Sequence, residues 1–261
     1  MNSRLNLLIH PIGFLMNVEM LSTKARILLA ICLIALPRAV TGQDFEVAPV
    51  LVSFDANPGE NQTRTITVRN HSNERQKFTL GLADYTVDQE GTKQAQPAGS
   101  TDRSLIDWLT INPAFLELNP NEEGSATLIL NVPRTGFNTR WGMVRIEVAK
   151  EKEPSMADKQ LATGILIVPR IVVLVKQSPR SNQNFSGSVK ELREVEGHHP
   201  EHRSFQATLV NSGDKILDAK VFLALANLET ALEEQFKPTP VTIYPGQERK
   251  VTLTLPVEPE P

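Results

Sequence analysis

The sequence predicts an all-β protein built from two tandem immunoglobulin-like β-sandwich domains, the second short or incomplete. Three observations support this: apolar residues alternate with polar ones over short stretches, turn-forming residues separate these stretches, and one strand-and-turn pattern occurs twice. Successive side chains of a strand point to opposite faces, so alternation is what a sheet with one buried face requires. The 18 Pro and 14 Gly among 261 residues fit many short elements joined by turns.

The N-terminal segment predicts export. Lys24 and Arg26 precede an apolar run over residues 27–36. That run is about half the ~20 residues that a membrane span needs. A basic flank, a short apolar core and small residues before a cleavage point are typical of a secretory signal. We therefore expect cleavage near Gly42/Gln43 and a mature chain without a membrane span.

The N-terminal extension and signal peptide together cover residues 1–42. Translation starts at Met1 or at Met20, because residues 1–19 are too long and too neutral for an ordinary leader. The leader also holds Cys32, the one cysteine of the chain. A single cysteine excludes a disulfide framework and a cysteine-based zinc site within the chain.

Alternating stretches predict the strands of the first sandwich. Residues 65–69 place Ile and Val between polar side chains, as a half-buried strand does. Residues 78–82 and 126–132 follow the same period of two. Asn-rich and Pro-containing turns at 70–73 and 119–122 separate these strands.

A weak internal repeat divides the chain. Residues 68–74 resemble 209–215, and residues 115–122 resemble 241–248. In both copies the second segment leads into an alternating strand. Two copies of this pattern predict two related sandwiches.

The polar stretch between the two copies sets the expected boundaries. The first sandwich covers residues 43–176, the linker 177–184 and the second sandwich 185–261. We expect one short helix, over residues 227–234.

The two copies differ in length. After Pro120 the first copy continues through two more predicted strands, within 141–148 and 164–175. After Pro245 the second copy has room for one strand, over 250–255. The second sandwich is therefore predicted to lack its last two strands and to expose a groove and unpaired strand edges, through which the chain could self-associate.

Several strand-and-turn motifs cover essentially all of the first sandwich and about half of the second. They are residues 44–49, 54–55, Gly59, 68–70, 108–113, 118–120 and 171–175. Together these motifs resemble the PapD-like periplasmic pilus-assembly chaperones. Related architecture also occurs in exported surface-scaffold modules.

The resemblance implies a mechanism and a place. Chaperones of this family are periplasmic, and they complete a pilin-like or other exported subunit by adding their own strand to it. Here the implied donor strand runs from Leu161 to Val175. Its partner-binding side chains would be Leu161, Ile165, Ile167, Ile171 and Val173.

In this family a basic pair anchors the terminal carboxylate of the subunit. The corresponding positions in this chain are Leu51 and Val172, so both basic residues are replaced by apolar ones. Arg170 lies two residues from Val172 and returns to the same face of the strand, which makes it the candidate cleft base.

The donor strand has a second interpretation. It is apolar on both faces, which is typical of a strand buried in the middle of a sheet. Pro169 cannot donate a backbone hydrogen bond, which favours an edge or a bulge instead. A core strand and a partner-binding edge both remain open.

Other site classes have weaker support. His198, His199 and His202 lie near three glutamates, but Gly197 and Pro200 indicate an ordinary solvated turn. Trp108 and Trp141 could stack on a sugar, although packing at strand boundaries explains them as well.

No common catalytic motif is present, neither a nucleophile elbow nor a phosphate-binding loop nor a His-Glu-x-x-His helix. The net charge of −3 and the isoelectric point of about 6.0 argue against nucleic acid as a partner. We expect a non-enzyme without metal or cofactor. The first hypothesis is a periplasmic chaperone-like protein that binds exported or fimbrial subunits by strand addition. The second is an envelope scaffold or adhesion module with the same fold.

Overall fold

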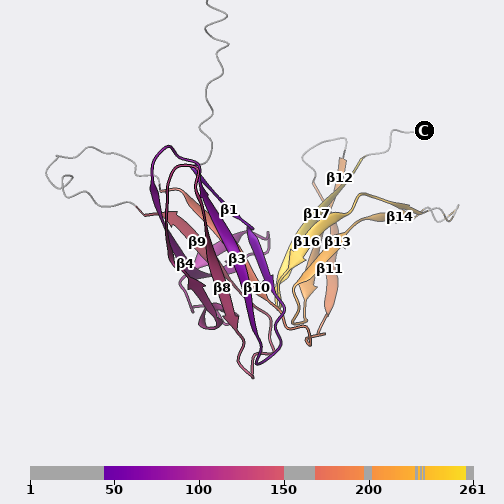
Figure 1. Cartoon of the computed structure of the whole chain (residues 1–261). Helices are drawn as coiled ribbons and strands as arrows, with labels where there is room; N and C mark the ends of the chain where they lie inside the picture. Colours follow the sequence, from indigo (N-terminus) through magenta and orange to yellow (C-terminus); the bar gives the residue numbers. More distant parts are fainter. Residues whose placement is uncertain are drawn as a thin grey trace, which may run out of the picture. The chain divides into compact units, whose positions relative to one another are not determined.

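The computed structural model describes residues 44–149, 168–196, 202–226, 229, 231 and 233–256 (Figure 1). The predicted leader lies outside these ranges, as do three of the predicted donor residues, Leu161, Ile165 and Ile167. Within the part of the chain that is described, no helix has the length and apolar character needed to cross a bilayer.

The first sandwich consists of two sheets. One has the order β1 (Phe45–Ala48), β3 (Asn61–Asn70), β8 (Glu123–Asn131) and β6 (Leu109–Asn112). The other has the order β2 (Leu51–Phe54), β10 (Arg170–Gln177), β9 (Arg140–Val148), β4 (Gln76–Val87) and β5 (Lys93–Gln96), and β7 (Phe115–Leu118) also pairs with β4. A short 3-10 helix, η2 (Ile106–Trp108), precedes β6.

The predicted alternation sets which side chains form the core. In β3, Ile66 and Val68 are fully buried. Arg69, the next residue, points to the opposite face and is exposed. Strands β8 and β9 turn their own alternate apolar residues toward the same interior. These residues are Ala126, Leu128, Leu130, Val144 and Ile146.

The C-terminal part of the chain forms smaller sheets. β11 (Gly187–Val195), β12 (His202–Asn211) and β17 (Glu248–Pro256) make a three-stranded sheet. β13 (Leu217–Val221) pairs with β16 (Thr239–Ile243), and β14 (Ala224–Ala226) pairs with β15 (Glu233–Gln235). Leu209, Val241, Ile243 and Val251 form the buried core between the sheets. The predicted fold class is confirmed.

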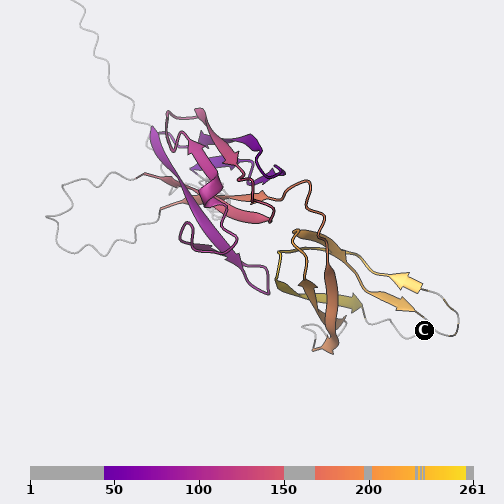
Figure 2. The ribbon, with the colours of Figure 1, turned by 90° about the horizontal axis from the view of Figure 1, so that it is seen from below.

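The predicted helix over 227–234 is corrected in its last residues, because Glu233 and Glu234 belong to strand β15. Figure 2 shows β14 and β15 as a hairpin at the far end of the second set of strands. Polar residues that suit a helix surface equally suit the exposed hairpin found here, since all three residues of β15 are exposed.

The internal repeat appears in the structure as two equivalent buried asparagines. Asn70 ends β3 and Asn211 ends β12, and both side chains are fully buried. Asn70 Nδ2 donates to the carbonyl of Glu74 at 2.7 Å, as Asn211 Nδ2 does to the carbonyl of Lys215 at 2.7 Å. Each asparagine therefore closes the turn that follows its strand.

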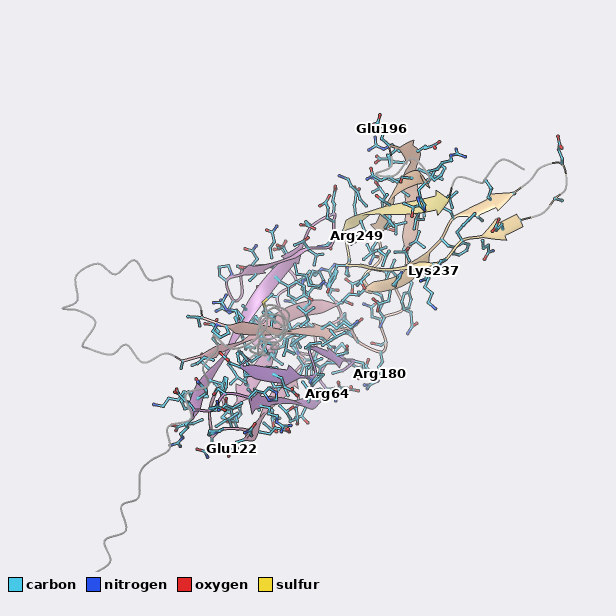
Figure 3. The ribbon with its side chains drawn as sticks, turned by 90° about the horizontal axis from the view of Figure 1, so that it is seen from above. Arg64, Glu122, Arg180, Glu196, Lys237 and Arg249 are labelled. Carbon is cyan, nitrogen blue, oxygen red and sulfur yellow. The ribbon has the colours of Figure 1, made fainter. Side chains whose placement is uncertain are left out.

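The two proline turns are equivalent as well. Asn121 has a φ of 61° and Gly246 a φ of 73°, each one residue after the proline. This left-handed position is required at the third residue of a type II turn and suits Asn and Gly. The backbone carbonyl of Glu122, a turn residue labelled in Figure 3, accepts a hydrogen bond from the backbone N–H of Asn70 at 3.0 Å. This bond joins the two turns of the first sandwich.

Candidate functional site: the open edge of β10

Strand β10 has one edge that is only partly covered. On one side it pairs with β9 along its whole length, from Arg170 opposite Glu147 to Gln177 opposite Arg140. On the other side β2 pairs with it in parallel, but only from Leu174 to Gln177. Over the described ranges, no strand pairs with this second edge before Leu174.

The alternation of backbone groups identifies what this edge exposes. The N–H of Leu174 donates to the carbonyl of Val50 at 2.9 Å, so it points to the β2 side. Residues two apart in a strand direct their backbone groups to the same side. Val172 and Arg170 therefore present their N–H and C=O groups toward the open edge.

The side chains of β10 hold the strand firmly in its own sandwich. Val173 is fully buried in the core and Ile171 packs against that core. These two predicted donor residues thus point into the first sandwich. Val172 and Leu174, on the opposite face, are half-buried. The strand is apolar on both faces, as predicted. The unpaired N–H and C=O groups of its open edge lie in the plane between these faces.

A buried glutamine holds the segment that follows β2 against the end of β10. Gln177 Oε1 accepts the N–H of Ala56 at 3.2 Å, and its Nε2 donates to the carbonyl of the same residue at 2.5 Å. Both residues are fully buried. Sequence analysis assigned Gln177 to the linker, because a polar residue beside Ser178 and Pro179 resembles a hinge; the structure makes it the last residue of the strand.

Replacing Gln177 with alanine is expected to lower the free energy of unfolding by about 2–3 kcal/mol, because both backbone groups of Ala56 would lose their buried partner. Chemical denaturation measures this change. Gln94→Ala, at an exposed position of β5, is the matched control and should change stability by less than ~0.5 kcal/mol. Equal effects of the two substitutions would contradict the role of the Gln177 amide.

A surface ion cluster holds the turn that follows β2. Arg180, labelled in Figure 3, contacts Glu60 at 2.6 Å and Asp55 at 3.3 Å. The backbone N–H of Asn57 donates to Glu60 at 2.9 Å. This hydrogen bond and then the Arg180 guanidinium keep the pKa of Glu60 below its ordinary 4.5.

The lowered pKa of Glu60 predicts a pH dependence. A carboxyl whose pKa is lower in the folded state contributes stability above its ordinary pKa and loses it as the pH falls through the lowered value. The urea concentration at the unfolding midpoint of the wild type should therefore decrease as the pH is lowered from 5 to 3. Glu60→Gln should reduce this fall, and an unchanged pH profile in the variant would refute the assignment. Glu74→Gln, at an exposed position, is the control.

The outer face of β9 and β10 carries two arginines and a glutamate. Arg170 Nε contacts Glu147 Oε1 at 2.8 Å, so the candidate cleft base is ion-paired and about half exposed. Arg145 stands directly opposite Val172 in the register. Its Nε is buried and has no hydrogen-bond partner within the described part of the chain. On its other side is Gly81, where an added side chain would meet no atom within 4 Å.

Sequence analysis did not single out Arg145. It lies among alternating residues of a predicted strand, where an arginine on the exposed face is ordinary. Its position beside Val172 follows only from the pairing of β9 with β10, which joins residues far apart in the chain. The structure therefore places the Arg145 side chain beside Val172 on the outer face of the sheet.

The other candidate groups have structural explanations. Trp141 is 4% exposed and donates its indole N–H to the carbonyl of Tyr85 at 3.1 Å, so its ring is not available to a sugar. Arg140 stacks on Trp108 at 4.5 Å. His198 and His199 lie outside the described residues. Among those that are described, no cluster of three or more metal-ligating side chains occurs, and Glu194 accepts two hydrogen bonds from Arg203.

No family model and no curated protein matches this chain. Among solved structures it is similar to the chaperone–tip adhesin complex of CFA/I fimbriae biogenesis, with 16% sequence identity over 80% of this chain and 88% of that chain and a TM-score of 0.47. It is also similar to the class 5 fimbriae chaperone CfaA, with 14% identity, 78% and 83% coverage and a TM-score of 0.45. A third is the CsuC–CsuE chaperone–tip subunit complex of Acinetobacter baumannii, with 12% identity, 80% and 90% coverage and a TM-score of 0.42. Fimbrial chaperones, the class that the sequence resembles, are thus among the similar structures.

Proposed function

We propose that this protein is a periplasmic, chaperone-like protein that binds exported or fimbrial subunits by adding a β-strand to them. The observation that carries the proposal is the edge of β10, which is open from Arg170 to Val173 among the described residues, on a strand whose inner face packs into the core. A sheet edge with free N–H and C=O groups is a template for another strand.

The packing of β10 favours binding. Binding costs less when the binding surface is already ordered, because less conformational entropy is lost. Val173 and Val175 are fully buried and the strand is paired with β9 throughout, so its edge is held in one conformation. A partner strand would need to order only itself.

The residues before β10 supply the proposed side-chain contacts. Leu161, Ile165 and Ile167 lie outside the described residues, and in an extended chain they point to one face. We assign them the role of filling an apolar groove of the partner. We assign a different role to Ile171 and Val173, the other two predicted donor residues. They anchor β10 in the core of the first sandwich.

Arg145 is assigned the role of the charged anchor, together with Arg170. Arg170 already has Glu147 as a partner, whereas the buried Nε of Arg145 has no partner within the described residues. A guanidinium can bind a carboxylate through two parallel hydrogen bonds. The space beside Gly81 would admit such a group.

The experiment tests strand addition directly. The mature chain is co-expressed with a pilin-like subunit, and complex formation is measured after purification. Ile165→Asp and Ile167→Asp should abolish the complex while the chaperone-like protein stays folded. Ala157→Asp, in the charged part of the same segment, is the control and should bind as the wild type does.

Amide exchange gives a second readout. The N–H groups of Arg170 and Val172 should exchange fast in the free protein and become protected in the complex, whereas Val173 should be protected in both states. Loss of folding in Ile165→Asp, or no new protection at Val172, would contradict strand addition. A subunit that never leaves the complex when a competing strand is added would favour the scaffold or adhesion module instead.

The anchor is tested separately. Arg145→Ala should weaken subunit binding at least tenfold, and Arg145→Lys should restore part of it. A subunit with an amidated C-terminus should bind the wild type and Arg145→Ala alike. Equal loss with the free and the amidated subunit would show that Arg145 does not bind the terminal carboxylate.

A further inference from the structure

Strand β13 of the second sandwich, labelled in Figure 1, has one free edge. Within the described part of the chain it pairs with β16 alone, from Leu217 opposite Ile243 to Val221 opposite Thr239. Beside this edge, between β13 and β11, lies an apolar groove with a volume of about 310 Å³. An unpaired edge beside an apolar groove is a place where a further strand can be added.

The position of Pro240 shows which backbone groups β13 directs to its free edge. In an antiparallel pair, opposed residues alternate between pairs that exchange both backbone hydrogen bonds and pairs that exchange none. Proline has no N–H to donate, so Lys220, opposite Pro240, belongs to a pair without these bonds. Asp218 lies two residues earlier and has the same orientation. The N–H and C=O groups of Asp218 and Lys220 therefore point to the free edge.

Apolar side chains line this edge. Leu217, Ala219 and Val221 form the inner face of β13, are half-buried and line the groove. Two further lining residues, Val189 and Phe222, are 64% and 44% exposed. Exposed apolar side chains gathered beside an unpaired strand mark a site of protein–protein contact.

We infer that β13 pairs with β13 of a second copy of the chain, in antiparallel orientation about a two-fold axis at Ala219. The sequence of the strand, Leu-Asp-Ala-Lys-Val, is complementary to itself in this register. Asp218 of each copy lies opposite Lys220 of the other, and Leu217 lies opposite Val221. Opposite charges and aliphatic side chains at directly opposed positions both stabilise a strand pair.

The backbone supports the same register. Asp218 and Lys220 direct their N–H and C=O groups to the free edge, so each opposed pair of these residues exchanges both backbone hydrogen bonds. Ala219 then meets Ala219 of the second copy at a pair without such bonds, where the Cα atoms approach to about 4.5 Å. The small alanine side chain leaves room for this approach.

The first sandwich has two strands at the place where the second has its free edge. Strand β4 follows the Asn70 turn as β13 follows the Asn211 turn, and β7 pairs with β4 as β16 pairs with β13. The other edge of β4 pairs with β9, and β9 pairs with β10, both antiparallel. In the inferred dimer, β13 and β16 of the second copy take these two places with the same antiparallel order.

The other edge strand at the groove is protected against pairing. Strand β11 has a register shift between Lys190 and Arg193, and Glu191 within it has a φ of 57°. Bulges and charged side chains keep edge strands from pairing with other chains. Strand β13 has a regular register and no proline. Of these two edges, β13 is therefore the one open to a second copy.

Sedimentation velocity of the mature chain over a range of concentrations measures the association. The wild type should form a dimer and no larger species, because each copy occupies the free β13 edge of the other. Lys220→Asp places two pairs of aspartates opposite one another and should weaken association at least tenfold. It leaves the contacts of Asp218 with Thr242 at 2.8 Å and with Lys176 at 3.6 Å in place. Lys250→Asp, at an exposed position of β17, is the control and should associate as the wild type does.

A charge exchange tests the register. Asp218→Lys/Lys220→Asp restores opposite charges at both opposed pairs and should regain the dimer. Asp218→Lys mixed with Lys220→Asp should form a heterodimer, although neither variant alone should dimerise as strongly as the wild type. Unfolding midpoints verify that all variants are folded. If neither the double variant nor the mixture regains association, Asp218 and Lys220 do not face each other and the inference is wrong.

A cysteine at the two-fold axis tests the contact directly. Outside the leader the chain has no cysteine, so Ala219→Cys introduces the one thiol of the mature chain. Because both copies of position 219 meet at the axis, mild oxidation should yield a disulfide-linked dimer. Thr254→Cys, at an exposed position of β17, should yield several-fold less. Equal yields would place the contact elsewhere on the chain and overturn the inference.

The inference goes beyond the proposed function, because a dimer joined through β13 carries the open edge of β10 twice. Lys220→Asp should lose the dimer and keep subunit binding, whereas Ile165→Asp should keep the dimer and lose the subunit. A wild type that stays monomeric at every concentration, or a Lys220→Asp variant that dimerises as the wild type does, would refute the pairing and leave strand addition standing. Loss of the dimer in Ile165→Asp would place the contact outside β13 and refute the inference as well.

Discussion

Replacing Asn70 with alanine is expected to lower the free energy of unfolding by about 4 kcal/mol. Its Nδ2 donates to the carbonyls of Glu74, Leu118 and Asn119, at 2.7, 3.1 and 3.1 Å. Its Oδ1 accepts from the N–H and the hydroxyl of Ser72. Each buried group left without a partner costs about 1–3 kcal/mol, and alanine would leave several of them.

The measurement is chemical denaturation of the mature chain with a control in the same turn. Asn73 is exposed, and Asn73→Ala should change the free energy of unfolding by less than ~0.5 kcal/mol. Asn211→Ala should repeat the large effect in the second sandwich, because Asn211 donates to Lys215 and Ile243 in the same way. A small effect of Asn70→Ala would show that water replaces the lost partners.

The asparagine pair also explains why the sequence predicts the two-sandwich fold so well. The repeated segments 68–74 and 209–215 are alike because each must end a strand with an asparagine that donates to the carbonyl four residues later. The Pro turns are alike because each needs a left-handed residue, Asn121 or Gly246. Local chemistry of this kind is readable from a sequence.

Long-range pairing is less readable, and the candidate site depends on it. Alternation over 164–175 predicts a strand but not which of its edges is covered. That follows from the pairing with β2, which covers β10 only from Leu174 to Gln177. Arg145 became a candidate only because β9 places it opposite Val172. Gln177 resembled a linker residue because its partner, Ala56, lies 121 positions away.

The orientation of β10 leads to the other large expected effect. Val173 is fully buried between the two sheets, so Val173→Asp would place a charge in the core without a partner. We expect a loss of about 5 kcal/mol or more, enough to unfold a sandwich of ordinary stability. The measurement is the loss of the cooperative unfolding transition and of the near-ultraviolet circular dichroism.

The adjacent position is the control that makes this prediction specific. Val172 is half-buried on the outer face and stands opposite Arg145. Val172→Asp should therefore cost less than ~2 kcal/mol, because its carboxylate can reach water and the nearby guanidinium. If Val172→Asp unfolded the protein as Val173→Asp does, the outer face of β10 would be as deeply buried as the inner face, which contradicts the half-buried position of Val172. A folded Val172→Asp beside an unfolded Val173→Asp would instead confirm that Val173 faces the core and Val172 the outer face.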